Sequence, residues 1–186
     1  MILFIDACVR ENSRTKRLAQ ALLKKLNEEV FRVALKEISF SVTDETYLQK
    51  RDNLISQGAF DDDMFALARQ FAEADTIVIA APYWDLSFPA MLKQYIEAIN
   101  VLGITFEYTP EGFPKGLCMA NKLYYVMTAG GNYVPTDYGF GYIETLAQNF
   151  YGIKTVELIK ATGLDIIGAD EEAILNEAIS TISGIS

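Results

Sequence analysis

Residues Thr76–Ala81 read TIVIAA, an unbroken apolar run of strand length that Pro82 ends. A strand with one solvated face alternates apolar and polar residues, so an unbroken run indicates a strand buried on both faces. A similar apolar run occurs at Met1–Ala7 (MILFIDA), and Phe31–Ile38, Leu123–Thr128 (LYYVMT) and Thr155–Ala161 (TVELIKA) are further strand candidates. The sequence therefore predicts five strands.

Helical patterns separate these strands. Apolar residues recur at helical spacing over residues 14–28, 61–74, 89–100, 140–151 and 171–183, and the less regular segment 39–59 holds a short helix from Asp44 to about Ser56. Parallel neighbours need such crossovers, and right-handed crossovers favour a doubly wound parallel sheet with helices on both faces. We find no linker or repeat, and we expect one α/β domain over residues 1–186.

Composition excludes several classes of function. The 186 residues carry a net charge of −9, which disfavours nucleic acid as a partner, because phosphate binding depends on clustered Lys and Arg. The chain has no histidine, which removes Ser-His-Asp catalysis and metal sites that use His. We expect no metal site.

Cysteine usage and hydropathy bear on the compartment. Cys8 and Cys118 lie among apolar residues, and we expect both to be buried and reduced in a cytoplasmic protein. No basic leader precedes the first apolar run, and no stretch approaches the ~20 apolar residues that cross a bilayer. We expect no membrane partner.

Ligands of open α/β sheets bind at the carboxyl ends of the strands, so the loops that follow the strands deserve inspection. The first loop and helix start, Ala7–Arg17, contain no glycine, which disfavours a dinucleotide fingerprint or a P-loop. This segment places Ser13 at a helix N-cap position and Thr15 in the first turn, where free N–H groups attract anions. Residues 1–25 carry six basic and two acidic residues, a local charge of +4. An ordinary capped helix with a solvated basic face also fits this pattern.

Two further loops carry aromatic residues and glycines. Pro82–Pro89 (PYWDLSFP) holds the only tryptophan, and such residues commonly line a planar ligand or a subunit interface, although the loop can also fold onto its own core. Thr128–Tyr133 (TAGGNY) has paired glycines, which let a ligand approach the backbone but also suit a plain turn. The three loops together indicate a mononucleotide with a flat ring, and FMN fits best.

The chain resembles the FMN-dependent NADH-azoreductases, within the wider flavodoxin-like NAD(P)H:quinone oxidoreductases. Three stretches carry the resemblance: Ala81–Lys93 (APYWDLSFPAMLK), Gly103–Leu117 (GITFEYTPEGFPKGL) and Thr128–Gly131 (TAGG). The resemblance implies a flavodoxin-like five-stranded sheet in the order 2-1-3-4-5. It also implies a homodimer with active sites at the subunit interface.

The resemblance further implies a role for individual residues. Ser13, Arg14 and Thr15 would hold the FMN phosphate; Tyr83, Trp84, Asp85 and Leu86 would edge the ribityl chain and the ring; Thr128, Ala129, Gly130 and Gly131 would contact the other side of the ring. Asn132 or Tyr133 would lie near the pyrimidine end of the ring, and Phe106, Tyr133 and Phe150 would contact substrate. NADH or NADPH would reduce FMN in a ping-pong reaction, and a quinone, azo or nitro aromatic compound would take the electrons. The flavin N5 would carry this chemistry, so we assign no catalytic side chain.

The chain departs from the family pattern at four places, one of which is the absence of the histidine that is frequent after the Gly-Gly pair. Ala7 stands where a serine is frequent, Trp84-Asp85 replaces a tyrosine–asparagine pair, and Ala129 replaces an arginine. Three alternatives stay open. The first is an electron-transfer flavodoxin, which the acidic charge suits. The second is a receiver-like signalling module, which Asp6 and Lys160 superficially suit but which needs an aspartate that the third strand does not offer. The third is a flavin-free binding protein.

Overall fold

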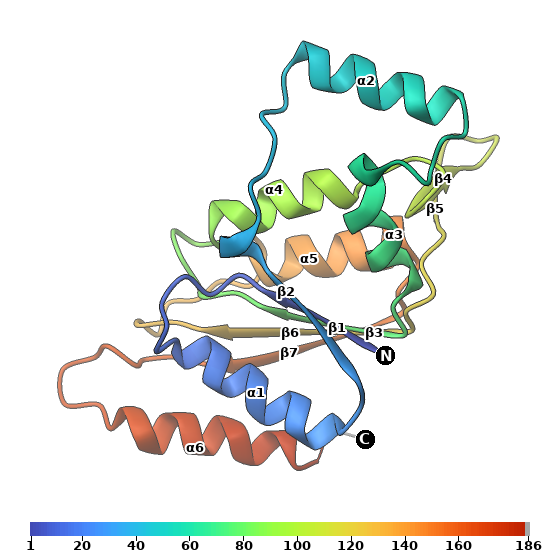
Figure 1. The fold of residues 1–186 in the computed structure, drawn as a ribbon. Coiled ribbons are helices and arrows are strands. Elements are labelled where there is room, and N and C mark those ends of the chain that lie inside the picture. The colour runs from blue at the N-terminus through green and yellow to red at the C-terminus, as the bar shows by residue number, and fades with distance from the viewer. Residues whose placement is uncertain (185–186) are drawn as a thin grey trace.

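Five parallel strands form the central sheet of the computed structural model, which describes residues 1–184 (Figure 1). They are β1 (Ile2–Asp6), β2 (Val30–Ala34), β3 (Thr76–Ala80), β6 (Lys122–Thr128) and β7 (Thr155–Ala161). Their order is β2-β1-β3-β6-β7, which is 2-1-3-4-5 when these five are counted along the chain. The flavodoxin-like fold is confirmed.

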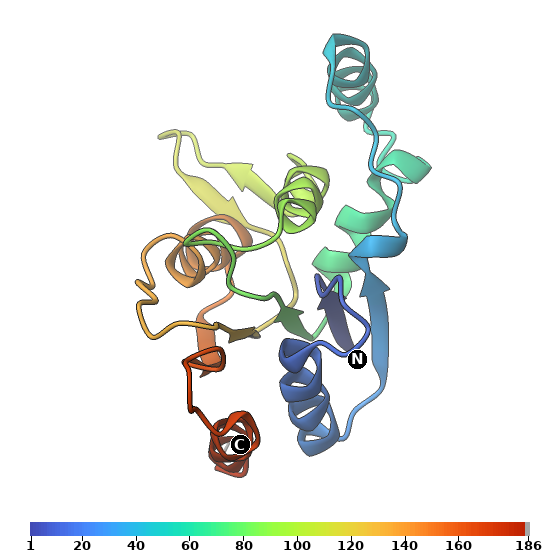
Figure 2. The same ribbon diagram turned by 90° about the vertical axis from the view of Figure 1, so that its left-hand side faces the viewer.

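Helices cover both faces of the sheet (Figure 2). One face packs against α1 (Arg14–Leu26) and α6 (Glu171–Ile182), and the other against α3 (Ala66–Glu73), α4 (Ala90–Ile99) and α5 (Phe140–Leu146). Successive side chains of a strand point to opposite faces, so Leu3 and Ile5 enter one core cluster while Ile2 and Phe4 enter the other. Both faces of β1 are therefore buried, and so is its one polar residue, Asp6.

Some element ends differ from the sequence prediction. β2 stops at Ala34, opposite the last residue of β1, because β1 is its only neighbour; a 3₁₀ turn, Leu35–Glu37, replaces the rest of the predicted strand. The helix predicted over residues 61–74 is a 3₁₀ turn, Asp63–Phe65, followed by α3. The helix predicted over residues 140–151 ends as a π-helical turn, Ala147–Tyr151, which Gly152 closes with a φ of 77°.

A hairpin absent from the prediction joins α4 to β6. β4 (Phe106–Tyr108) pairs antiparallel with β5 (Pro114–Gly116). It packs on the π-helical turn that precedes β7, so it lies at the end of the sheet where the strands begin (Figure 1). The hairpin is therefore remote from the carboxyl ends of the strands.

The predicted helix in segment 39–59 is confirmed as α2 (Glu45–Ser56), which Asp44 caps by accepting a hydrogen bond from the Tyr47 N–H at 2.8 Å. α2 has no buried residue and stands away from the other helices (Figure 1). Among residues 1–184, no helix is both long and apolar enough to span a bilayer.

Candidate functional site

A polar cleft of about 150 Å³ opens at the carboxyl end of the sheet. It lies where β1 and β3 meet, which is the point at which the strand order reverses. Its walls come from the three loops that the sequence singled out and from one more: Val9, Arg10, Asn12–Thr15, Pro82–Trp84, Thr128, Gly130 and Asp165.

The N-terminus of α1 forms one wall of this cleft. Ser13 is the N-cap, as predicted, and its hydroxyl accepts a hydrogen bond from the Lys16 N–H at 3.3 Å. The N–H groups of Arg14 and Thr15 make no hydrogen bond within residues 1–184. Such unpaired donors and the helix dipole favour a bound anion, and the Ser13 hydroxyl keeps its own proton to donate.

The basic residues of this wall are mostly paired. Arg14 Nη1 lies 2.7 Å from Asp165 Oδ1 and 3.0 Å from Glu171 Oε2, and Arg17 pairs with Glu172 at 2.6 Å. These carboxylates raise the pKa of both guanidinium groups. The local charge of +4 seen along residues 1–25 is therefore largely cancelled by partners more than 150 residues away in sequence.

Asp6 anchors the start of the first loop. Its side chain is only 1% exposed, and Oδ2 accepts from Lys16 Nζ at 2.9 Å and from Arg32 Nη2 at 2.7 Å. Oδ1 accepts from the Cys8 N–H at 3.0 Å. Burial acts to raise the pKa of Asp6, but the hydrogen bonds from both cations outweigh burial and hold it below 3.8. Lys16 therefore forms an ion pair with Asp6. Of the two cations that line the cleft, Arg14 is paired, and Arg10 has no ion pair among the described residues.

Thr15 and Thr128 tie the first loop to β6. Both side chains are buried, and their hydroxyl oxygens lie 2.6 Å apart. The Thr15 hydroxyl, which we expect at the phosphate, is hydrogen-bonded to Thr128 in this structure, and Thr15 also lines the cleft. The main-chain N–H of Thr15 is the group that this position offers to an anion.

The aromatic loop contains a strained turn. Trp84 and Ser87 exchange hydrogen bonds of 3.1 and 2.7 Å between their main chains, and between them Asp85 and Leu86 both have positive φ, 52° and 65°. Residues other than Gly, Asn and Asp seldom adopt this conformation, so Leu86 is the strained residue, and such strain concentrates at binding sites. Trp84 remains 41% exposed, and Tyr83 donates to the Pro135 carbonyl at 3.4 Å.

The glycine loop is backed by the chain after β7. Gly130 lines the cleft, whereas Ala129 is buried and its N–H donates to the Ala161 carbonyl at 2.9 Å, so its side chain points into the core. The sequence pointed to three loops but not to a fourth, the loop after β7, which brings Asp165 into the cleft. The signal available was Gly163-Leu164-Asp165, directly after the fifth predicted strand.

The cysteines offer no nucleophile. Both are free thiols; Cys8 is buried as predicted, but Cys118 is only partly buried. Burial raises the pKa of each thiol to about 12, so neither is a thiolate near neutral pH. The cleft therefore provides an anion site, an aromatic wall and main-chain donors, but no titrating group suited to nucleophilic catalysis.

This combination of fold and cleft has relatives among known proteins. The family model described as a flavodoxin-like fold matches residues 1–184. The chain belongs to that family. A relative 36% identical over 190 residues, covering 96% of this chain and 94% of its own, is the FMN-dependent NADH:quinone oxidoreductase 2 of Clostridium acetobutylicum.

Two other known proteins are similar to this chain. The FMN-dependent NADH:quinone oxidoreductase of Clostridium perfringens (strain ATCC 13124) is 46% identical over 114 residues, which span 60% of this chain and just over half, 57%, of that protein. The crystal structure of azoreductase AzrA superposes with a TM-score of 0.79 at 26% identity, covering 98% of both chains. The predicted family membership is confirmed.

Two of the three residues expected at substrate, Phe106 and Phe150, lie apart from the cleft. They pack edge to face with ring centroids 5.2 Å apart, on the hairpin and the π-helical turn at the opposite end of the sheet. Tyr133 ends the glycine loop and is 82% exposed, near Tyr83 of the cleft. One subunit does not bring these three aromatic residues together, so their contact with substrate stays a prediction.

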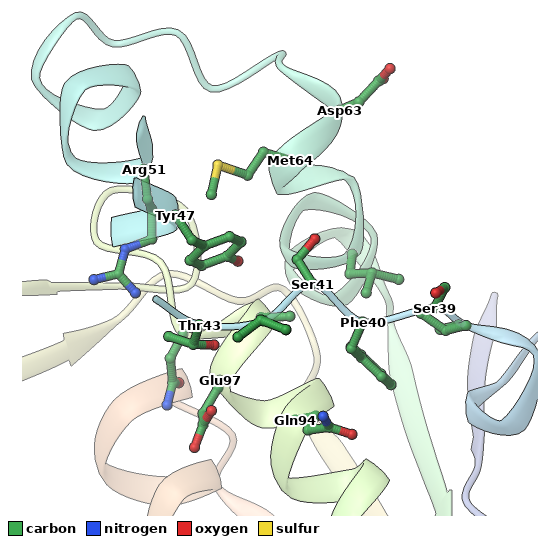
Figure 3. A pocket seen from close by; sticks show the side chains of 15 residues that line it. Ser39, Phe40, Ser41, Thr43, Tyr47, Arg51, Asp63, Met64, Gln94 and Glu97 are labelled. Carbon is green, nitrogen blue, oxygen red and sulfur yellow. The ribbon is translucent and has the colours of Figure 1, made fainter. Parts of the chain in front are cut away.

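A larger cavity of about 590 Å³ lies under α2 (Figure 3). Four labelled side chains project around it: Tyr47 of α2, Ser41 and Thr43 of the segment before α2, and Glu97 of α4. It is lined by neither the α1 N-terminus nor the loops after β1, β3 and β6. We therefore do not assign it to the site.

Proposed function

We propose that this chain is an FMN-dependent oxidoreductase that takes a hydride from NADH or NADPH and reduces quinones, azo compounds or nitroaromatics. The unpaired N–H groups of the α1 N-terminus, opening into a polar cleft beside the strained aromatic turn, carry the proposal. The named activity of the 36% identical relative, which aligns over almost its full length, supports the same chemistry.

The cleft residues fit FMN. A phosphate group suits the N-terminus of α1, because unpaired N–H groups and the helix dipole attract anions there. It would be held by the Ser13 hydroxyl, the N–H groups of Arg14 and Thr15, and the Arg10 side chain. Tyr83 and Trp84 offer an aromatic wall for a flat ring, and Gly130 also lines the cleft. When bound, FMN supplies hydride acceptance and donation at its ring.

The protein's task is then to bind, orient and exclude water. Burial, with Tyr133 nearby, raises the pKa of Tyr83, so this residue is a neutral hydrogen-bond donor rather than a base. Trp84 lines the cleft with its side chain 41% exposed, where it would exclude water from one side of a bound ring. Main-chain N–H groups of the two loops favour the negative charge that a reduced ring carries.

The substrate side of the site needs a second copy of the chain. Phe106 and Phe150 cannot reach their own cleft, and a homodimer with the site at the interface would bring them to the partner's cleft. α2 also supports association, because a 12-residue helix with no buried side chain gains little stability alone. We further propose a single domain acting in the reducing cytoplasm, which suits two free thiols.

Replacing Ser13 tests the phosphate assignment. We expect Ser13→Ala to weaken FMN binding by about tenfold, the typical worth of a charge-assisted hydrogen bond, and to leave riboflavin binding nearly unchanged, since riboflavin lacks the phosphate. Flavin fluorescence quenching measures both constants. Ser180→Ala on α6, whose hydroxyl donates only to the Glu177 carbonyl, is the matched control. Unchanged FMN affinity in Ser13→Ala places the phosphate elsewhere.

A further inference from the structure

The loop between β7 and α6 is fastened to the glycine loop. The N–H of Asp165 donates to the Gly130 carbonyl at 2.9 Å, and that of Gly163 donates to the Gly131 carbonyl at 3.1 Å. A third bond runs from the Leu164 N–H to the Ala129 carbonyl at 3.3 Å. The two loops therefore form one rigid wall of the cleft.

The Asp165 carboxylate lies directly against Gly130 in this wall. A Cβ atom on Gly130 would lie 2.1 Å from Asp165 Oδ2 and 2.9 Å from its Cγ, so the carboxylate would have to move for any larger residue. The paired glycines of this loop predict a place where a ligand approaches the backbone. In this structure the space above Gly130 is taken by the protein's own anion.

This anion engages the cation that the cofactor phosphate is expected to meet. Asp165 Oδ1 accepts from Arg14 Nη1 at 2.7 Å, and Glu171 of α6 accepts from the same nitrogen at 3.0 Å. Arg10, on the first loop, is the other charge facing Asp165, and Arg14 with Arg10 holds the pKa of Asp165 below its ordinary value. Two cations and two carboxylates thus balance at the mouth of the cleft.

We propose that Asp165 is a positioning residue that sets the affinity of this site for the phosphate group of the cofactor, by competing with it for Arg14. A phosphate at the α1 N-terminus would lie near the Arg14 guanidinium that now donates to Asp165. Arg14 can donate fully to this phosphate only if its hydrogen bond to Asp165 weakens. Asp165 therefore narrows the difference in affinity between FMN and unphosphorylated flavin. This inference rests on the proposed function.

Flavin affinities of Asp165→Asn test this role. Asparagine keeps the shape beside Gly130 but lacks the charge, so we expect the FMN dissociation constant to fall by about tenfold at low salt while that of riboflavin stays within about twofold. Glu172→Gln is the matched control, because it removes the similar pair with Arg17 outside the cleft. In an Arg14→Gln background, the gain from Asp165→Asn should disappear.

Three results would overturn the inference. Weaker FMN binding by Asp165→Asn would mean that the carboxylate helps Arg14 to hold phosphate. Equal changes for both flavins would mean that Asp165 only supports the loop. A gain that persists in the Arg14→Gln background would mean direct repulsion rather than competition. Each leaves the proposed function standing, whereas a wild-type protein that binds neither flavin contradicts the function and this inference together.

Discussion

Asp6 shows how one buried carboxylate holds three elements in place. It accepts hydrogen bonds from Lys16 of α1, Arg32 of β2 and the Cys8 N–H. Replacing it with asparagine leaves two cations beside a neutral group, and we expect the free energy of unfolding at pH 7 to fall by about 3 kcal/mol. Urea titration measures this loss, with the exposed Asp75→Asn as control.

The cost of Asp6→Asn depends on pH in a defined direction. The folded state lowers the pKa of Asp6 below 3.8, so its contribution is present above that value and is lost as the pH falls through the folded pKa. The difference in stability between wild type and Asp6→Asn should therefore shrink below about pH 4. A difference independent of pH would contradict a charged Asp6.

Two core tyrosines give a matched pair. The Tyr95 hydroxyl is buried without a hydrogen-bond partner, whereas the Tyr151 hydroxyl donates to Asn100 Oδ1 at 2.7 Å. Removing an unpaired buried hydroxyl is neutral or stabilising, so Tyr95→Phe should keep or raise the stability. Tyr151→Phe should lose about 1 kcal/mol. Thermal unfolding of both variants decides, and the reverse order would contradict the assigned hydrogen bonds.

Among the elements, the β4–β5 hairpin is held by a close backbone contact. A Cβ on Gly116 would lie 2.1 Å from the Tyr151 carbonyl carbon, and backbone cannot yield as a flexible side chain does. We expect Gly116→Ala to destabilise the protein by about 3 kcal/mol. Gly131→Ala meets no atom within 4 Å and is the control. Equal stability of the two variants would contradict this contact.

The sequence predicted long elements well and short ones poorly. Apolar runs identified β1, β3 and β6 within one residue at either end, because burial on both faces leaves a plain signal. The edge strand β7 is only partly buried, and its ends were predicted as observed. β4 and β5 have three residues each, too few to show a period, and were missed.

For the site, Ser13 was found as an N-cap because capping is local in sequence. Two contacts were missed, the Arg14–Asp165 ion pair and the Thr15–Thr128 hydrogen bond, because each joins residues more than 110 positions apart.

At the scale of the whole molecule, the proposed dimer makes a prediction by complementation. Ser13→Ala removes a cofactor contact, and Phe106→Ala removes a contact that we assign to the partner's cleft. In an equimolar mixture unfolded and refolded together, half the dimers are mixed, and one of their two sites carries neither change. We expect about one site in four to regain the wild-type KM for quinone. No recovery would mean that Phe106 serves its own subunit's cleft or none.

The central claim is that this chain binds FMN and that NADH reduces the bound FMN. The most direct test is the visible spectrum of the purified protein with equimolar FMN, followed by NADH without oxygen. We predict that the flavin bands bleach within the mixing time in a two-electron step and return when quinone is added. FMN that binds but keeps its bands after NADH would contradict the reductase account and favour an electron carrier. A protein that leaves added FMN unbound would contradict the cofactor site itself.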